Sequence, residues 1–156
     1  MSGAVAEQER QVERLSRPEL RAWGGFLRTH ARIVRRLDAE LRAAHGLSLS
    51  AYEVLLYLAL APDGRLRMCA LAESLLLTPS GITRVVDRLA EAGLVERCGD
   101  EADKRGMYAQ LTGEGRRRFA EAQRTHLAGV RAAFLDRVTA AERAQLGAIW
   151  ERLASD

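Results

Sequence analysis

Small polar and basic side chains share one face of a helix that the sequence predicts after Thr78. Thr78 is a favourable N-cap residue, and Pro79 suits the first helical position, where its missing N–H costs nothing. Apolar residues at i, i+3, i+4 and i+7 would hold this helix against a core: Ile82, Val85, Val86 and Leu89. The outward face would then present Ser80, Thr83, Arg84, Asp87 and Arg88.

Recognition of nucleic acid is the chemistry that this face could perform. Ser80 and Gly81 lie in the first turn, where short side chains and free N–H groups let a phosphate approach. Arg84 and Arg88 are one turn apart, so together they could reach base edges or the backbone in a major groove. The alternative is that both arginines are solvated and paired with acidic residues of the same helix.

A charged hairpin follows the predicted helix. Residues 94–98 and 107–111 can form two antiparallel strands, and the loop between them contains Asp103, Lys104 and Arg105. Arg105 near the tip could enter a minor groove, where the local negative potential is strong. Asp103 could orient the Arg105 guanidinium through a bidentate pair. A short helix, a turn, a second helix and such a hairpin together describe a winged helix-turn-helix.

Helices are predicted on the N-terminal side of this unit. A long helical pattern begins at Pro18 and ends at Gly46. Ser50 is predicted to cap the next helix, which is apolar almost all round and should therefore be central and buried. A third helix should cover about residues 67–76, immediately before the turn that leads to Thr78.

Two more helices are predicted after the hairpin. Thr112 should cap a long helix through about Val138, and a last helix should cover about residues 140–153. A monomer of this size would struggle to cover both terminal helices, whereas a two-fold dimer would cover them and present two reading helices. The predicted interface comprises Phe119, Leu127, Val130, Phe134 and Val138. The alternative is a compact monomeric bundle.

The predicted fold class is mainly α with a small β-hairpin wing: a winged helix-turn-helix core flanked by N- and C-terminal dimerisation helices. We expect residues 1–17 to be a flexible segment, residues 18–46 and 113–156 to be the dimerisation helices, and residues 47–112 to be the DNA-binding lobe. The charge of +3 is only mildly basic, and no apolar run approaches the roughly 20 residues that span a bilayer. The N-terminus lacks a secretory signal, so we expect a cytoplasmic protein with no membrane partner.

The sequence resembles the MarR family of transcriptional regulators. The resemblance rests on LAESLLLTPSGITRVVDRLAEAGLVER, on the wing segment DEADKR and on LTGEG, and it covers roughly residues 20–153. The Asp-x-Arg of the family wing falls on Asp103 and Arg105. The resemblance implies a homodimeric regulator, expected to be a repressor, that binds double-stranded DNA at a palindromic operator. It also implies control by a small, aromatic or anionic, ligand.

Family members commonly bind such ligands in the crevice between the dimer helices and the DNA-binding lobe. The candidate residues here are Trp23, Phe26, His30, Tyr52 and Glu53. The alternative is that Trp23 is a core residue and Arg84 belongs to DNA recognition alone. We expect no cofactor and no metal site, because the three histidines show no metal-ligand spacing.

Two other classes of function stay open at this point. A protein-interaction module is one, because acidic residues outnumber basic ones, four to three, from Glu96 to Arg105. A redox-sensing regulator is the other, acting through Cys69 or Cys98, although Cys69 is expected to be buried and Cys98 exposed. The chain has no HExxH motif, glycine-rich phosphate loop or GxSxG motif, so we expect no enzyme.

Overall fold

The computed structural model of the protein describes residues 15–99 and 106–155. The chain divides inside its first helix into two compact units, residues 1–32 and 33–156, which are described one at a time. The elements in chain order are α2 (Arg17–His45), α3 (Leu49–Leu60), β1 (Arg65–Arg67), α4 (Met68–Ser74), α5 (Pro79–Glu91), β2 (Val95–Gly99), β3 (Met107–Leu111), α6 (Gly113–Ala133), the 3₁₀ turn η1 (Leu135–Arg137) and α7 (Ala140–Leu153).

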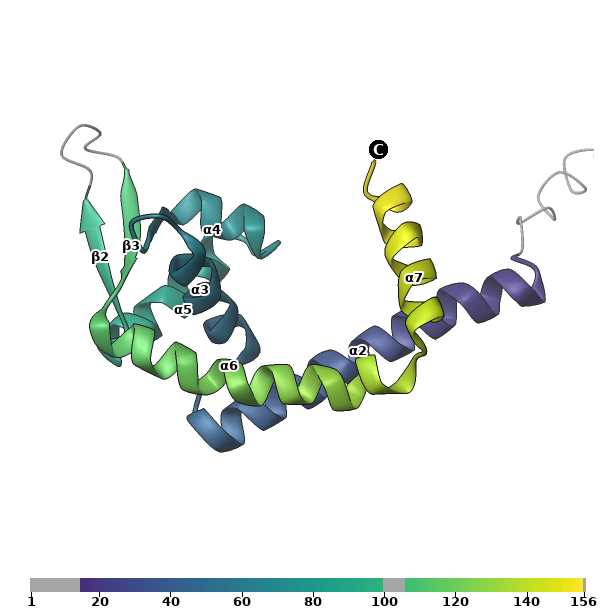
Figure 1. Ribbon diagram of the computed structural model, residues 1–156. Coiled ribbons are helices and arrows are strands. Elements are labelled where there is room, and N and C mark those ends of the chain that lie inside the picture. Colours follow the sequence, from purple (N-terminus) through teal and green to yellow (C-terminus); the bar gives the residue numbers. More distant parts are fainter. Residues whose placement is uncertain (1–14, 100–105, 156) are drawn as a thin grey trace, which may run out of the picture. The chain divides into compact units, whose positions relative to one another are not determined.

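A small antiparallel sheet forms the β part of the second unit, and β2 and β3 project from it as a hairpin (Figure 1). The strand order is β1-β3-β2, with Leu66 opposite Ala109 and Arg97 opposite the same residue on the other side. The hairpin was predicted, whereas β1 was not. Strand β1 has only three residues, with one apolar side chain between two arginines. This is too short for an alternating pattern that would indicate a strand.

Helix α3 is the central element of the second unit, as its sequence predicts. It packs against α5, α6 and the sheet, and Val54, Leu55 and Leu58 on it are fully buried. The α5 stripe and residues of β2 and β3 close the same core. The short helix α4 adds Leu71 and Ala72 to it and, with α5, forms the helix-turn-helix.

The helix ends show which predicted caps are correct. Thr78 and Thr112 accept hydrogen bonds from backbone N–H groups of α5 and α6 as predicted, and Gly93 ends α5 with φ of +70°. The predicted cap of α3 at Ser50 is wrong. Ser48 caps that helix by accepting from the Ala51 N–H at 3.1 Å, so Ser50 lies inside the first turn. The helix therefore begins two residues earlier than the apolar pattern indicates.

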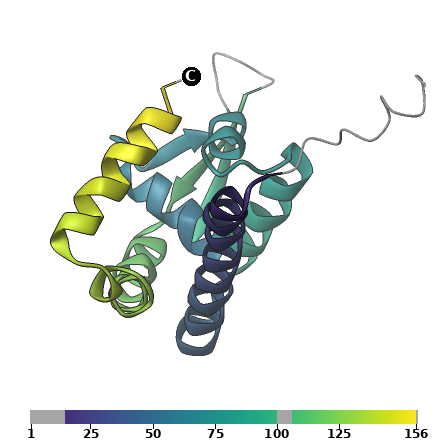
Figure 2. The same cartoon turned by 90° about the vertical axis from the view of Figure 1, so that its right-hand side faces the viewer.

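Helix α6, which follows the hairpin, is shorter than predicted. Helix α6 ends at Ala133 rather than at Val138, and Phe134 leaves the helical region at φ −135°, ψ −64°. The Arg137 side chain donates to the Ala132 carbonyl at 2.9 Å, which satisfies one of the carbonyl groups at the helix end. Helix α7 then begins with a capping box made by Thr139 and Glu142. Figure 2 views α6 nearly along its axis, with α7 turning away from its end.

Among residues 15–99 and 106–155, no single helix is long and apolar enough to cross a membrane, although α2 and α3 pass that test as a bent pair.

Candidate nucleic-acid interface

Helix α5 is fixed in place by its cap and by its apolar stripe. Thr78 Oγ1 accepts from the Gly81 N–H at 3.1 Å, and Pro79 occupies the first turn. Ile82, Val86 and Leu89 are buried, as their spacing predicts, and Val85 is partly buried. The opposite face of the helix is therefore held at a defined angle toward solvent.

The exposed face of α5 carries two arginines without partners. Arg84 and Arg88 are exposed, and within the described part of the chain neither makes a hydrogen bond or ion pair. Asp87 does not pair with either of them. It binds instead the Arg97 guanidinium of β2, with an N···O distance of 2.5 Å. In the described residues, Arg84 and Arg88 are therefore not paired with acidic residues of their own helix, which was the alternative.

The small residues of the first turn are partly committed to local bonds. The Thr83 hydroxyl donates to the Pro79 carbonyl at 2.8 Å, so it supports the helix as well as facing outward. Ser80 Oγ lies 3.2 Å from Thr78 Oγ1. A Cβ at Gly81 would lie 3.1 Å from the same Thr78 oxygen, so a larger residue here would crowd the N-cap.

The hairpin is fastened to α5 by the Arg97–Asp87 pair. The sequence interpretation missed this role of Arg97, because nothing in the spacing of two residues ten positions apart indicates that they meet. The wing residues predicted to contact DNA, Lys104 and Arg105, and their predicted support, Asp103, lie outside the described residues. Strands β2 and β3 lead directly to that loop from both sides.

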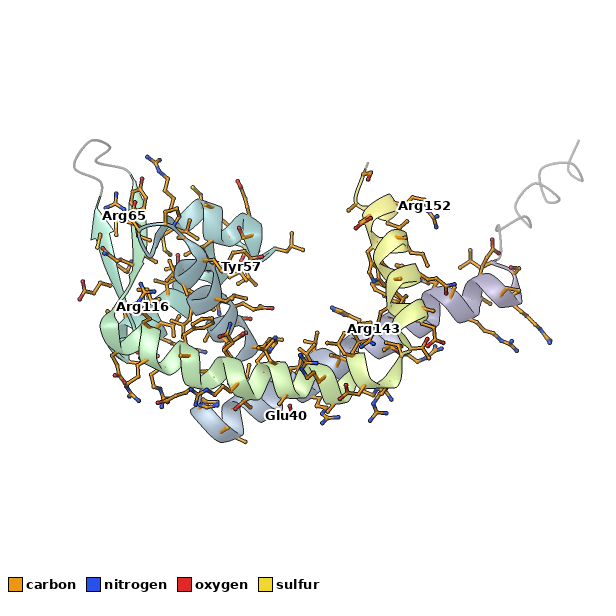
Figure 3. The ribbon with its side chains drawn as sticks, in the orientation of Figure 1. Glu40, Tyr57, Arg65, Arg116, Arg143 and Arg152 are labelled. Carbon is orange, nitrogen blue, oxygen red and sulfur yellow. The ribbon has the colours of Figure 1, made fainter. Side chains whose placement is uncertain are left out.

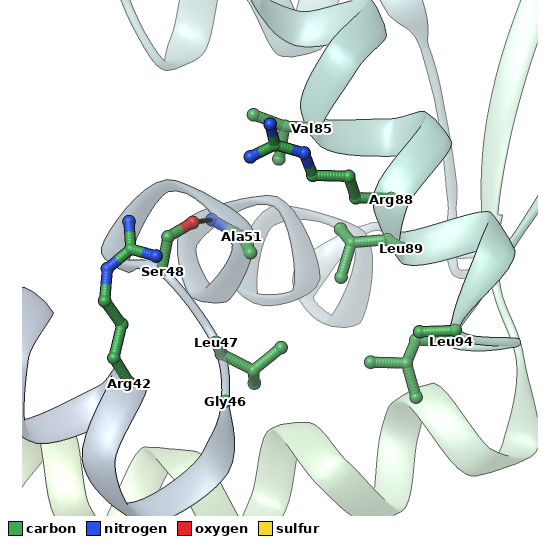
Figure 4. Close-up of a pocket in the computed structure, with 10 residues that line it drawn as sticks. Arg42, Gly46, Leu47, Ser48, Ala51, Val85, Arg88, Leu89 and Leu94 are labelled. Atoms are coloured by element: carbon green, nitrogen blue, oxygen red, sulfur yellow. Dashed lines mark hydrogen bonds between the residues drawn. The ribbon is translucent and has the colours of Figure 1, made fainter.

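A small cavity lies beside the C-terminal half of α5. Its volume is about 140 Å³, and its lining includes Arg42 of α2, Ser48 at the start of α3, and Val85 and Arg88 of α5. In Figure 4, Leu47, Leu89 and Leu94 point toward its centre. The cavity therefore combines an apolar floor with two guanidinium groups.

The Arg42 side chain is held at this cavity by an acid. Its Nε donates to Asp38 at 2.6 Å, and the other Asp38 oxygen accepts from the Leu49 N–H at 2.8 Å. The Arg42 and Leu49 hydrogen bonds lower the pKa of Asp38, so that carboxyl stays ionised and keeps Arg42 in place.

The predicted ligand residues fall into the two units. In the first, the rings of Trp23, Phe26 and His30 follow one another at centroid distances of 6.0 Å. Trp23 is 56% exposed. In the second unit, Tyr52 is buried and Glu53 is half-buried, and burial raises the pKa of both side chains.

Tyr52 is a core residue of the second unit. Its ring stacks on Phe119 at 5.7 Å and on His126 at 4.4 Å, between centroids. Phe119, predicted at the dimer interface, is thus buried by its own chain. Of the other residues predicted there, Leu127 is exposed, whereas Val130, Phe134 and Val138 are half-buried. Helix α7 has no buried residue, and Trp150 and Leu153 on it are exposed.

Both cysteines differ from the expectation. Cys69 was expected to be buried but is exposed, whereas Leu71 and Ala72 on the same helix are buried. Cys98 is only half-exposed, and its Sγ lies 3.6 Å from Gln110 Oε1. No group of three or more potential metal ligands occurs among the described residues.

The comparisons with known proteins agree with this architecture. A family model described as MarR family matches residues 45–106. The chain is 27% identical over 123 residues to the HTH-type transcriptional regulator PapX of Escherichia coli, a match that covers 79% of this chain and 65% of PapX. It is 32% identical over 116 residues to the HTH-type transcriptional repressor YetL of Bacillus subtilis, covering 72% of this chain and 69% of YetL.

A solved structure matches over most of the chain. Sco3205, a MarR family transcriptional regulator from Streptomyces coelicolor, was crystallised in complex with DNA. It matches with a TM-score of 0.86 at 32% identity, over 91% of this chain and 89% of Sco3205. The helix-turn-helix, the hairpin and the long flanking helices described above are thus shared over nearly the whole length. The chain belongs to the MarR family of transcriptional regulators.

Proposed function

We propose that the protein is a homodimeric, sequence-specific DNA-binding repressor that recognises a palindromic operator. The observation that carries the proposal is the exposed face of α5, where Arg84 and Arg88 have no partner among the described residues while the opposite face is buried. Unpaired guanidinium groups one turn apart suit the bases and phosphates of a major groove. The similarity to Sco3205, whose structure contains DNA, supports the same partner.

The dimer part of the proposal rests on side chains that the chain does not cover by itself. Leu127 on α6 and Leu153 on α7 are exposed apolar groups. A two-fold dimer would bury such groups and would place two copies of α5 on one side of the assembly. We no longer include Phe119 in this interface, because its ring is buried against Tyr52 of the same chain.

The cavity beside α5 supports control by a small anionic ligand. Its volume of about 140 Å³ is close to the roughly 150 Å³ of a cavity that holds one benzene ring. A carboxylate could pair with Arg42 and Arg88 while an apolar body rests on Leu47 and Leu89. Because Arg88 also belongs to the reading face, a ligand there would compete with DNA for the same guanidinium.

Alanine variants at the two arginines test DNA recognition. Arg84→Ala and Arg88→Ala should each weaken operator binding by about 1–3 kcal/mol, the range for a specific base contact. The measurement is a gel-shift titration with DNA selected by the native protein. Arg124→Ala, an exposed arginine of α6, is the matched control and should bind normally. Unchanged affinity in both α5 variants would refute this reading face. A protein-interaction module would show no salt-dependent retention on DNA at all.

A further inference from the structure

The ion pair between Asp87 and Arg97 adjoins the reading face of α5, the exposed side that carries Arg84 and Arg88. Asp87 lies between those two arginines in the sequence of the helix, and its side chain is half-exposed. Arg97 Nη1 donates to Asp87 Oδ1 at 2.5 Å. A third arginine, from strand β2, is therefore bound to the acid that separates the two reading arginines.

The sheet register explains why Arg97 meets α5. Successive side chains of a strand point to opposite faces of the sheet, so Val95 and Arg97 share one face and Glu96 belongs to the other. Val95 is buried, and Arg97 is opposite the buried Ala109 of β3, so the shared face is the one toward the core. Strand β2 packs against α5, and Arg97 lies two positions beyond the buried valine, where its guanidinium reaches Asp87.

Helical spacing gives Asp87 a second basic neighbour. Arg84 is three residues before Asp87, and side chains at i and i+3 of a helix are close enough to form an ion pair. Within residues 15–99 and 106–155, Arg84 nevertheless makes no ion pair or hydrogen bond, and Asp87 binds Arg97 instead. Without Arg97, the Asp87 carboxylate would attract the Arg84 guanidinium and would repel any phosphate that approaches the helix.

We propose that Arg97 is a positioning residue for DNA recognition, which masks the Asp87 carboxylate and so keeps Arg84 free to contact DNA. This inference rests on the proposed DNA-binding function and gives Arg97 a role that needs no contact between Arg97 and DNA. An exposed ion pair of this kind adds little to the stability of a fold. Its effect on binding is larger, because each phosphate of the duplex carries a negative charge that an unmasked Asp87 repels.

Two variants that break the same ion pair separate this role from a purely structural one. Arg97→Gln leaves the acid in place and should weaken binding to DNA selected by the native protein about tenfold, within the range of couplings between charges in contact. Asp87→Ala removes the acid itself, so this variant should bind the same DNA at least as tightly as the native protein. If the pair served only to fasten the hairpin to α5, both variants would lose affinity alike.

The double variant Arg97→Gln/Asp87→Ala separates masking from a direct contact. Because no acid remains to be masked, the double variant should bind the selected DNA within about threefold of the native protein. If Arg97 instead bound a phosphate, the double variant would stay weak, and its slope of log K against log salt would be shallower by about 0.9. Fluorescence anisotropy at several salt concentrations measures the affinities and slopes, and circular dichroism checks that each variant is folded.

The matched control is Arg36→Gln, which removes an exposed arginine from its ion pair with Glu40 on α2, where the N···O distance is 2.7 Å. Figure 3 labels Glu40 on that helix. The control should bind DNA as the native protein does, and an equal loss there would overturn the inference, since only overall charge would then matter.

Three other outcomes would also overturn the inference while leaving the proposed function standing. They are native affinity in Arg97→Gln, a loss of affinity in Asp87→Ala, and a double variant that binds as weakly as Arg97→Gln. A native protein that binds no DNA would refute the proposed function itself.

Discussion

Leu76 adopts a backbone conformation that leucine disfavours. Its φ is +52°, and it is the one non-glycine residue with positive φ in the described part of the chain. It follows α4 as Gly93 follows α5. In both places the next N–H, of Leu77 or Leu94, reaches back to the helix at 2.9 Å. This motif normally has glycine at the left-handed position. The Leu76 side chain is 93% exposed, so packing within the protomer does not compensate for the strain.

Leu76→Gly should therefore stabilise the protein. The left-handed conformation costs an L-residue about 1–2 kcal/mol, and glycine loses about 0.5–1 kcal/mol more backbone entropy on folding. The net gain in the free energy of unfolding should be up to about 1 kcal/mol, measured by urea denaturation. Leu60→Gly is the control, because Leu60 is also exposed but lies within α3. Because Leu60 is the last residue of α3, that change should destabilise by less than the roughly 1 kcal/mol that glycine costs in a helix interior. Destabilisation in both variants would mean that Leu76 makes contacts in the native assembly.

His126 is the residue from which acid sensitivity is expected. Its Nδ1 is buried and has no hydrogen-bond partner among residues 15–99 and 106–155, and burial lowers the pKa of the imidazole below the ordinary 6.5. The unfolded chain therefore takes up a proton below pH 6.5 that the folded chain resists. Stability is fully present above that pH and is lost as the pH falls from 6.5 toward the folded-state pKa.

His126→Leu should remove this part of the pH dependence. The free energy of unfolding of the native protein should fall between pH 7 and pH 5, and that of the variant should fall less over the same interval. Parallel urea titrations at several pH values provide the comparison. His30→Leu, at an exposed position, is the control and should retain the native slope. Identical slopes for the native protein and for His126→Leu would assign the acid sensitivity to other groups.

At the scale of elements, the sequence predicts best what local chemistry decides. The cap at Thr78, the stop at Gly93 and the ends of α7 are correct because each depends on residues within one turn. Strand β1 was missed because its pairing with β3 joins residues more than forty positions apart, as in the Arg67–Tyr108 bond. The Arg97–Asp87 pair, ten positions apart, and the cavity at Arg42 were missed because they also depend on contacts between different elements.

Packing explains two residues of the LTGEG segment, Thr112 and Gly115. Thr112 caps α6 by accepting from the Gly115 N–H at 2.9 Å and donates its own hydroxyl hydrogen to the Gly93 carbonyl at 2.8 Å. These bonds bring α6 so close to the end of α5 that a Cβ at Gly115 would overlap the Leu94 carbonyl group. The threonine and the second glycine of the motif therefore fix the angle between α6 and the reading unit.

Gly115→Ala should consequently be far more harmful than Gly113→Ala two positions earlier. The added methyl group at Gly115 meets backbone atoms that cannot move aside, so the cost should be about 1–3 kcal/mol, as for other overpacked sites. A Cβ at Gly113 meets nothing within 4 Å, and that variant should be neutral or slightly more stable. Thermal unfolding of the two variants gives the comparison. Equal stabilities would show that α6 can shift at no cost.

At the scale of the whole molecule, the proposed dimer sets the form of the operator. If a two-fold axis relates two copies of α5, each copy meets the same sequence on opposite strands, so the operator is an inverted repeat. The half-site centres should lie about one helical turn apart, roughly 10 base pairs or 34 Å, so that both helices face one side of the duplex. Arg84 and Arg88 of each copy would then occupy successive major grooves.

Inserting about five base pairs at the operator centre tests this geometry, because it turns one half-site by roughly half a turn away from its reading helix. Dimer binding should be abolished although each half-site keeps its sequence. Inserting about ten base pairs is the control. Both half-sites then face the same side of the duplex again but lie farther apart, so binding should remain weak. DNase footprinting measures the protection of each half. Full protection of both halves on the five-base-pair operator would mean that the half-sites are bound independently. The two-fold arrangement of α5 would then be wrong, even with Arg84 and Arg88 still reading DNA.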